Sequence, residues 1–440
     1  MPAEENDAGL GDGRARLVAS DLQLSGLQSP VSSGLSETVR VMHVVHCLGS
    51  NGRTGGMEYG VIKLVNALDR ARVVSGVCST RLADPAISRL LDPAVSYREL
   101  DGRRGGNDPR LVWSMRRVFR EFRPHIVHTH SWGTLIEGML AAKLARVPVV
   151  VHGEHGTRQT KRRQVLVQRF VWKRVDQLLS VSSRLAESLV REVGIEPERI
   201  HTIRNGVDLS RFGRVARGDA RRSLGLDDQS VVLGTVGRLV EVKDHSTLLR
   251  AFALVARECR RAVLLLAGEG PLGTALEAQA RELDIADRVR FLGHRPDVER
   301  VLAALDVFVL SSLSEGMSNT ILEAMASGVA VVATAVGGAD ELVVEGVTGL
   351  LVPRRDPEAM AAAMLSITTD DVVRRRMAIA GYERAQAEFA LQRMVMEYEN
   401  LYARLYAERT AGNVAFPGDP SAVPDRRTPV ATSNRVRQRP

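Results

Sequence analysis

Two carboxylates in one short segment are the residues of this chain whose types and spacing most readily suggest chemistry. Glu315 and Glu323 lie eight positions apart in SEGMSNTILEAMASG. The Gly, Ser and Asn residues after the first acid predict an irregular turn, and the apolar run that follows predicts a helix. One acid is therefore expected in a loop and the other on a helix. A surface acid followed by a helix-start acid would show the same spacing, so this pair does not decide the function alone.

The predicted start of this helix is itself a candidate anion site. Asn319 or Thr320 is expected to serve as its N-cap. The first N–H groups of a helix have no partner within it and carry a partial positive charge. A phosphate is therefore expected beside Met317, Ser318 and the two candidate caps. Glu323 could then accept hydrogen bonds from a ribose hydroxyl pair.

A second candidate segment, VVLGTVGRLVEVKDHSTLLRAF, supplies two cations. Its apolar start predicts a buried strand that ends near Gly237, directly before Arg238 and Lys243. Arg can hold phosphate oxygens with its planar fork, and Lys adds a point charge. The two could neutralise a leaving nucleoside diphosphate, although a pair of solvated surface cations would look the same.

Together these segments resemble the retaining, nucleotide-sugar-dependent glycosyltransferases of the GT-B fold, often called glycosyltransferase family four. The family's paired-glutamate signature matches Glu315 and Glu323, and its diphosphate clamp matches Arg238 and Lys243. The resemblance extends over most of residues 39–405. It includes the segments 181–190, 204–212, 264–272 and 290–298. The fold it implies is α/β, with two facing Rossmann-like domains, parallel sheets and an interdomain cleft.

In the first half of the chain, the family's glycine-rich loop corresponds to VMHVVHCLGSNGRTGGMEYGVIKLVNAL. The resemblance implies that Gly55 and Gly56 let the backbone approach the donor phosphates. The loop has no G-x-G-x-x-G pattern, which argues against an NAD-dependent oxidoreductase.

The family's active-site histidine matches His155 in PVVVHGEHGTRQ, with His152 as a second candidate. An isolated histidine is more often structural, but His155 follows a predicted strand and is flanked by glycines. His128 and His130, in PHIVHTHSWGT, are expected either to line the acceptor side or to pack in the core.

The resemblance also implies a mechanism in which the acceptor attacks on the face that the diphosphate leaves, and the diphosphate takes the acceptor proton. The implied catalytic residues are Arg238, Lys243, Glu315 and His155. The two cations would stabilise the departing diphosphate, Glu315 would contact the transferred sugar, and His155 a sugar hydroxyl. Glu323 would hold the ribose. The backbone of residues 293–298, which include His294, would hold the base.

No metal or cofactor is expected. Asp-x-Asp does not occur, and no His or Cys cluster has the spacing of a zinc site. The expected substrate is a UDP-, GDP- or ADP-sugar, whose base and sugar these residues do not specify. Cys47, Cys78 and Cys259 occur singly, which favours reduced, packed thiols and a cytoplasmic location.

The length and the apolar patterning predict two domains and two dispensable ends. A chain of 440 residues exceeds what one core usually covers. Alternating apolar runs and helical patterns predict two parallel sheets covered by helices. We expect an acceptor-side domain at 39–210 and a nucleotide-sugar-binding domain at 211–390. A helix at 391–410 would cross back to the first domain, and the tails 1–38 and 411–440 would be disordered.

Charge is unevenly distributed between the two predicted domains. Lys and Arg exceed Asp and Glu by 12 in residues 39–210, whereas the acids exceed by 3 in 211–410. In 110–123 and 158–174 the cations alternate with aromatic residues, namely Trp113, Phe119, Phe122, Phe170 and Trp172. Such helices suit a membrane surface or a phosphate-bearing partner, unless their aromatics are buried and only their cations are solvated.

The function predicted from the sequence is transfer of a sugar, with retention, from a nucleotide sugar to an acceptor. A lipid-linked saccharide on the inner face of the membrane would explain the basic first domain, so peripheral membrane association is expected. No nucleic-acid-binding motif is present. The first half is similar to bacterial transferases of exopolysaccharide and exosortase-linked gene clusters. A sugar-nucleotide epimerase and a non-catalytic nucleotide-sugar-binding protein are the alternatives. Oligomeric state is not predicted.

Overall fold

The structure is a computed structural model that describes residues 38–49, 55–103, 108–156 and 162–412. The predicted tails, 1–38 and 411–440, fall outside these residues except for their innermost one or two positions. The part of the glycine-rich loop at 50–54 also lies outside them.

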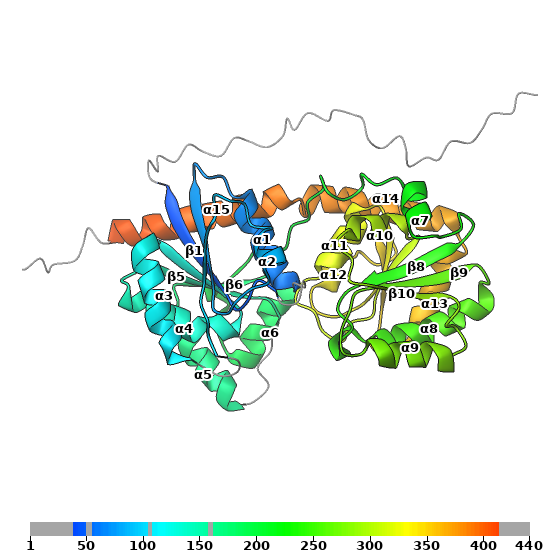
Figure 1. The fold of residues 1–440 in the computed structure, drawn as a ribbon, viewed down its shortest axis with the longest axis horizontal. Coiled ribbons are helices and arrows are strands. Elements are labelled where there is room, and N and C mark those ends of the chain that lie inside the picture. Colours follow the sequence, from blue (N-terminus) through cyan, green and yellow to red (C-terminus); the bar gives the residue numbers. More distant parts are fainter. Residues whose placement is uncertain (1–37, 50–54, 104–107, 157–161, 413–440) are drawn as a thin grey trace, which may run out of the picture.

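The first domain is built on a seven-stranded sheet in which every pairing is parallel, in the order β3-β2-β1-β4-β5-β6-β7 (Figure 1). Its strands are β1 (Val39–Val45), β2 (Val73–Ser79), β3 (Ser96–Glu99), β4 (Ile126–His130), β5 (Val149–Glu154), β6 (Gln177–Ser180) and β7 (Ile200–Thr202). The helices between them are α1 (Gly56–Ala67), α2 (Pro85–Ser88), α3 (Pro109–Phe122), α4 (Trp132–Leu144), α5 (Arg162–Trp172) and α6 (Ser183–Val193). The strand order reverses between β1 and β4, where open α/β sheets bind ligands.

The second domain repeats this plan with six parallel strands in the order β10-β9-β8-β11-β12-β13. They are β8 (Val231–Val236), β9 (Ala262–Ala267), β10 (Val289–Gly293), β11 (Val307–Leu310), β12 (Ala330–Thr334) and β13 (Gly349–Val352). Its helices are α7 (Arg217–Ser223), α8 (His245–Glu258), α9 (Gly273–Glu282), α10 (Val298–Ala304), α11 (Asn319–Ala326), α12 (Ala339–Leu342), α13 (Pro357–Thr368) and α14 (Asp371–Glu388). Here the order reverses between β8 and β11.

The central strands are continuous apolar runs because helices cover both faces of each sheet. Every residue of β4, β5, β11 and β12 is buried. The polar members of β4 and β5 therefore stand out, since a buried histidine or glutamate needs a hydrogen-bonding partner. They lie at the carboxyl ends of the strands.

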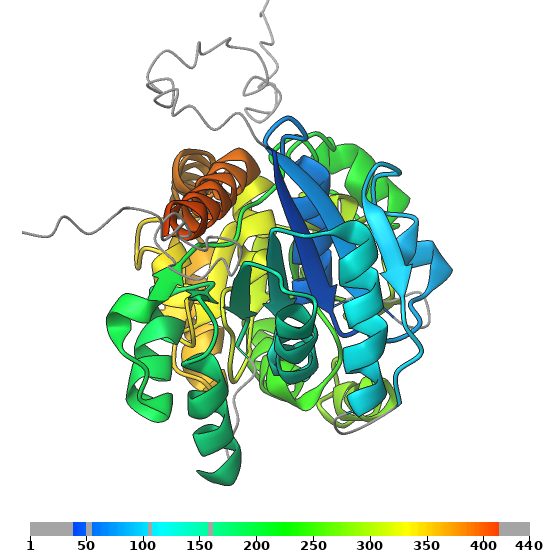
Figure 2. The ribbon, with the colours of Figure 1, turned by 90° about the vertical axis from the view of Figure 1, so that its left-hand side faces the viewer.

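Two segments of chain connect the domains, and they bond to each other. Val207 N–H donates to Phe389 O at 2.8 Å, and Leu391 N–H donates to Val207 O at 3.0 Å. The chain then continues as α15 (Leu391–Gly412), which returns along the first domain (Figures 1 and 2). Tyr402 of α15 is fully buried against the first sheet, and Glu399 forms an ion pair of 2.6 Å with Arg72.

The two sheets confirm the predicted fold class, with two Rossmann-like domains side by side (Figure 1). The predicted domain boundary, between residues 210 and 211, lies between β7 and α7. Within the described ranges, no helix is both long and apolar enough to span a membrane.

A buried ion pair fixes the base of the second sheet. Asp306, directly before β11, accepts from Arg221 at 2.7 Å and from Val232 N–H at 2.8 Å. Its other oxygen pairs with Arg217 at 2.5 Å. The Asp306 and Arg221 side chains are both almost completely buried, so removing one leaves the other charged and unpaired in the interior.

We predict that Asp306→Ala lowers the free energy of unfolding by about 3–5 kcal/mol. The control is Asp219→Ala, which removes an exposed ion pair with Arg222 and should cost less than about 1 kcal/mol. Denaturant unfolding of both variants measures the difference. Equal losses in the two would contradict the role of the buried pair.

Candidate active site

A cavity of about 880 Å³ lies between the two domains, at the carboxyl ends of both sheets. All twelve site residues predicted from the sequence line it. They are Gly55, Gly56, His155, Arg238, Lys243, His294, Glu315, Met317, Ser318, Asn319, Thr320 and Glu323. The structure thus brings together residues that the sequence spreads over more than half of the chain.

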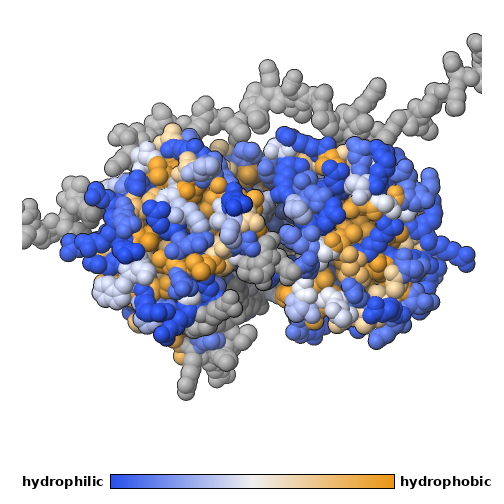
Figure 3. Space-filling model, viewed as in Figure 1, coloured by the Kyte–Doolittle hydropathy of each residue, from blue (hydrophilic) through white to orange (hydrophobic). Residues whose placement is uncertain are grey.

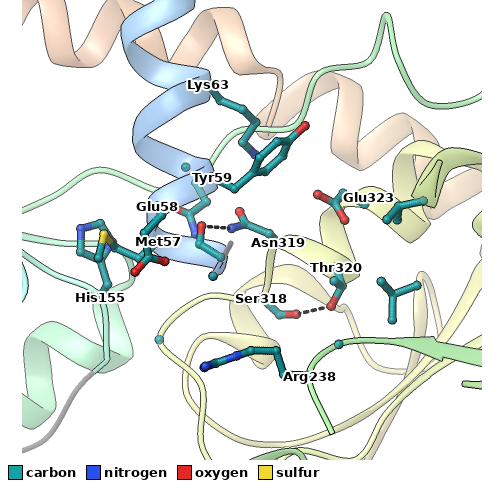
Figure 4. Close-up of a pocket in the computed structure, with 18 of the residues that line it drawn as sticks. Met57, Glu58, Tyr59, Lys63, His155, Arg238, Ser318, Asn319, Thr320 and Glu323 are labelled. Carbon is teal, nitrogen blue, oxygen red and sulfur yellow. Dashed lines mark hydrogen bonds between the residues drawn. The ribbon is translucent and has the colours of Figure 1, made fainter. Parts of the chain in front are cut away.

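The junction after β11 forms the loop and helix that the sequence predicts, with one difference. The N-cap of α11 is Ser318, whose hydroxyl accepts from Ile321 N–H at 3.3 Å. Neither Asn319 nor Thr320, the predicted caps, takes this role, because α11 begins one residue earlier than expected. Asn319 instead donates to Gly56 O of the first domain at 3.1 Å (Figure 4). The start of α11 is therefore held against the start of α1 across the cleft.

Glu323 lies one turn into α11 and is almost completely buried. Burial raises the pKa of its carboxyl group, and the nearby cations Lys63 and Arg211 oppose this effect. Lys63 reaches this region from α1 (Figure 4), and it donates to Gly206 O at 3.0 Å. A buried carboxylate with unused acceptor positions suits a pair of hydroxyl donors.

The other glutamate, Glu315, is already occupied in this structure. Its Oε1 pairs with Lys243 Nζ at 2.5 Å and accepts from the Ser312 hydroxyl at 2.6 Å. The family resemblance implies that Glu315 contacts the transferred sugar and that Lys243 stabilises the diphosphate. In this structure the two side chains neutralise each other. Arg238 lines the same cavity. It makes no ion pair among the described residues, although the Glu58 carboxyl group is close enough to interact with it electrostatically. It is the cation of the predicted clamp that remains available for an anion.

Two loops from different domains touch at this site through glycines. A Cβ atom added to Gly316 would lie 2.5 Å from the carbonyl oxygen of His155, and one on Gly156 would lie 2.9 Å from Gly316 N. Gly316 O also accepts from the Ser182 hydroxyl at 3.0 Å. The domains are therefore in a closed arrangement, with Glu315 and His155 facing the same cavity.

His155 faces the cleft, whereas His152 does not. The His155 ring bonds through Nε2 to Nδ1 of His130 at 3.1 Å, and burial lowers its pKa to about 4. His152 is fully buried, bonds to the Thr129 hydroxyl at 2.9 Å and does not line the cavity. Of the two histidines that the sequence left open, His155 is the one in reach of a substrate.

The pair on β4 divides in the same way. His130 lines the cavity, whereas His128 is turned toward α15 and bonds to the Tyr402 hydroxyl at 2.8 Å. Of the two alternative roles predicted for this pair, packing therefore applies to His128 and cleft lining to His130.

Several cleft residues escaped the sequence analysis. Glu58, Tyr59 and Lys63 project from α1, which directly follows the glycine-rich loop, and Arg211 lies in the RNGVDLSRF segment. Burial raises the pKa of Glu58, and the nearby Arg238 partly opposes this effect. Glu58, Tyr59 and Lys63 could have been predicted, because they follow the glycine-rich loop and the first turns of a helix at this position face the ligand.

Comparisons with known proteins agree with this arrangement. A family model described as Glycosyltransferase Family 4 matches residues 54–211, and one described as Glycosyl transferases group 1 matches residues 230–370. A UDP-Gal:alpha-D-GlcNAc-diphosphoundecaprenol alpha-1,3-galactosyltransferase of Escherichia coli is 33% identical over 278 residues, covering 60% of this chain and 72% of that protein. The chain belongs to glycosyltransferase family 4.

This glycosyltransferase is also 33% identical over 400 residues to a D-inositol 3-phosphate glycosyltransferase of Xylanimonas cellulosilytica, covering 82% of this chain and 94% of the relative. Among solved structures it resembles HepE of Anabaena in complex with UDP and glucose. The TM-score is 0.73 and the identity 22%, with 83% of this chain and 99% of HepE covered. The expected GT-B fold is confirmed.

We predict that Gly316→Ala lowers turnover by about tenfold or more, because the new methyl group would push the loop away from His155 and misalign the reacting groups. The backbone of Gly316 does not need a positive φ, so the folded domains should keep their stability. Steady-state kinetics and thermal unfolding measure the two effects.

Gly273→Ala is the matched control. A Cβ atom there makes only ordinary contact, 3.7 Å from Leu239, at the start of α9. Its turnover should stay close to that of the wild type. Wild-type turnover in Gly316→Ala would show that the close approach is not needed.

Proposed function

We propose that this glycosyltransferase moves a sugar from a nucleoside-diphosphate sugar to a lipid-linked saccharide, with retention at the anomeric carbon. The observation that carries this proposal is the convergence of the two glutamates and the two cations in one closed cleft. The name of the galactosyltransferase relative also supports this proposal, because that name includes a diphosphoundecaprenol-linked saccharide.

In this proposal the ribose, the diphosphate and the base of the donor each bind to a different region of the cleft. Glu323 takes the ribose hydroxyls, and the backbone N–H groups at the start of α11 take phosphate oxygens. Gly55 and Gly56 let the loop backbone approach the same phosphates. Arg238 neutralises the diphosphate as it leaves. The base lies along residues 293–298, where His294 N–H donates to Glu269 at 3.1 Å and the loop is thereby held in place.

The contacts of Glu315 support a retaining route that forms no covalent bond to the enzyme. Its carboxylate is bound by Lys243 and Ser312, which weakens it as a nucleophile. A route without a covalent enzyme intermediate is then favoured. The bond from the anomeric carbon to the diphosphate breaks, and the acceptor oxygen bonds on the same face. The acceptor proton passes to the departing diphosphate oxygen, while the protein supplies position and charge.

Exposed residues on the first domain support the proposed lipid-linked acceptor. Of the five aromatics in its basic segments, two are buried, two are exposed, and Phe122 is partly buried against the core. Phe119 and Trp172 are core residues, whereas Trp113 and Phe170 are 63% and 58% exposed. Exposed apolar side chains on α4 and α5 accompany them, namely Leu140, Leu144, Leu166 and Val167. Hydrophobic residues reach the surface among hydrophilic ones on this domain (Figure 3). Together with the excess of Lys and Arg in this domain, they suit peripheral contact with an anionic membrane.

The two alternative functions are less well supported. The relatives compared above are named glycosyltransferases, and neither an epimerase nor a silent binding protein needs a second, acceptor-side surface of this kind.

We predict that one donor of a panel of UDP-, GDP- and ADP-sugars binds without divalent metal, and that Glu323→Ala weakens it about tenfold or more because the ribose loses charge-assisted hydrogen bonds. Calorimetry measures the affinity. Glu277→Ala, an exposed carboxylate of α9 outside the cleft, is the control. Glu315→Gln should lower turnover more than donor affinity. If no donor binds, the nucleotide-sugar assignment fails.

A further prediction concerns metal and stereochemistry. With cations in place of a metal, EDTA should change the rate by less than about twofold, and added Mn²⁺ should not raise it. The product, followed by proton NMR as it forms, should carry the anomeric configuration of the donor. A rate lost with EDTA and restored by Mn²⁺ contradicts the first part, and an inverted product contradicts the second.

A further inference from the structure

Three histidines from different parts of the first domain form one chain of ring-to-ring hydrogen bonds. His43 Nδ1 lies 3.1 Å from His130 Nε2, and His130 Nδ1 lies 3.1 Å from His155 Nε2. His43 comes from β1, His130 from the end of β4, and His155 from the loop after β5. The chain therefore runs from the interior of the sheet to the cleft.

The neighbouring backbone is shaped to hold this chain. A Cβ atom added to Gly153 would lie 3.0 Å from His128 Nε2 and 3.3 Å from His155 Nε2, so a side chain there would crowd the rings. Glu154 is buried, and its Oε1 accepts from the backbone N–H groups of His155 and Gly156 at 3.0 and 3.2 Å. The orientation of His155 is thus fixed at its backbone as well as at its ring.

A metal ion is a competing explanation, because His43, His128 and His130 each place one ring nitrogen within 4.8 Å of the others. The ring geometry favours protons instead. The ring planes of His43 and His130 are nearly parallel, at 15°, with centroids 5.4 Å apart and facing nitrogens at normal hydrogen-bond distance. His128 and His130 are tilted by only 34° with centroids 4.0 Å apart, so their nitrogen lone pairs run side by side rather than converging on one point.

Each of the three rings carries one proton at neutral pH. Burial lowers the pKa of His43 to about 3 and that of His155 to about 4, and it lowers the pKa of His130 well below its ordinary value. Each contact between two such rings holds one proton. The protons of the chain must therefore all point the same way.

The inner end of the chain sets this direction. His43 Nε2 is buried and has no hydrogen-bond partner among the described residues. A buried N–H without an acceptor is rarer in proteins than a buried acceptor without a donor, so Nε2 carries no proton. His43 then donates through Nδ1 to His130, and His130 donates through its own Nδ1 to Nε2 of His155. The remaining proton of His155 lies on its Nδ1.

We infer that His43 and His130 are positioning residues that hold His155 as the Nδ1–H tautomer, so that His155 meets the substrate as a hydrogen-bond donor and not as a base. His155 Nδ1 makes no hydrogen bond within the part of the chain that the structure describes, and His155 lines the cavity. The tautomer itself is independent of the proposed function. Its effect on turnover rests on that function, because the sugar oxygen that receives this bond is part of the proposed reaction.

The first test reads the tautomer directly and needs no substrate. Protein labelled with ¹⁵N-histidine is examined by NMR, with the His155 signals assigned by their loss in His155→Asn. The wild type should show a single Nδ1–H form. His43→Phe removes the inner donor and should give a mixed or Nε2–H form, whereas His43→Asn, whose amide nitrogen can take the place of Nδ1, should restore the wild-type form.

An Nε2–H form in the wild type, or an unchanged His155 in His43→Phe, would overturn the inference. Ring signals of His43 or His130 that change when a chelator is added would replace it with a metal site. Thermal unfolding of both variants shows whether each has folded. If His43→Phe has not, His130→Phe serves in its place.

The second test separates positioning from general loss of structure. Once a donor and an acceptor are known, His43→Phe should lower kcat about tenfold and leave the KM for the donor within twofold, while His43→Asn keeps most of the turnover. Equal losses in the two variants, or a loss confined to KM, would overturn the positioning role. If the wild type has no transferase activity, the proposed function fails, and the NMR result still decides the tautomer.

Discussion

The close approach of two loops across the interdomain cleft is the constraint on which the rest of this structure depends. Gly156 and Gly316 meet with no room for a side chain between them and the backbone of the opposite domain. This contact brings the end of the first sheet, with His155, against the end of the second, with Glu315. Each sheet alone presents half of a site at its switch point, and only the contact turns the two halves into one cavity.

Much of this site could be predicted from the sequence because its residues follow strands. Arg238 and Lys243 follow the apolar run of β8, and Glu315 and Glu323 follow that of β11. Parallel strands place the segments that follow them at one edge of a sheet. The same logic predicted the two domains. It needs no knowledge of tertiary contacts, only the alternation of apolar and polar segments and the turn chemistry of glycine.

What the sequence did not reveal depends on partners that are distant in the chain. Nothing near His43 indicates that its ring contacts His130, because the two share a sheet face only once β1 and β4 pair. The ion pair of Glu315 with Lys243 was hidden for the same reason. The N-cap of α11 was misplaced by one residue, since Ser, Asn and Thr in succession are all good caps and packing decides among them.

The paired crossing of the chain at Val207 and Leu391 has a mechanical consequence. A single connecting strand would let one domain swivel about many axes, whereas two strands hydrogen-bonded to each other restrict it to bending about the line of their contact. The two connecting segments then act as a hinge, and domain opening and closure follow one path. Closure along one path brings the same two glycines back into contact each time. The alignment of the reacting groups is therefore set by the two connecting segments and not by the domains themselves.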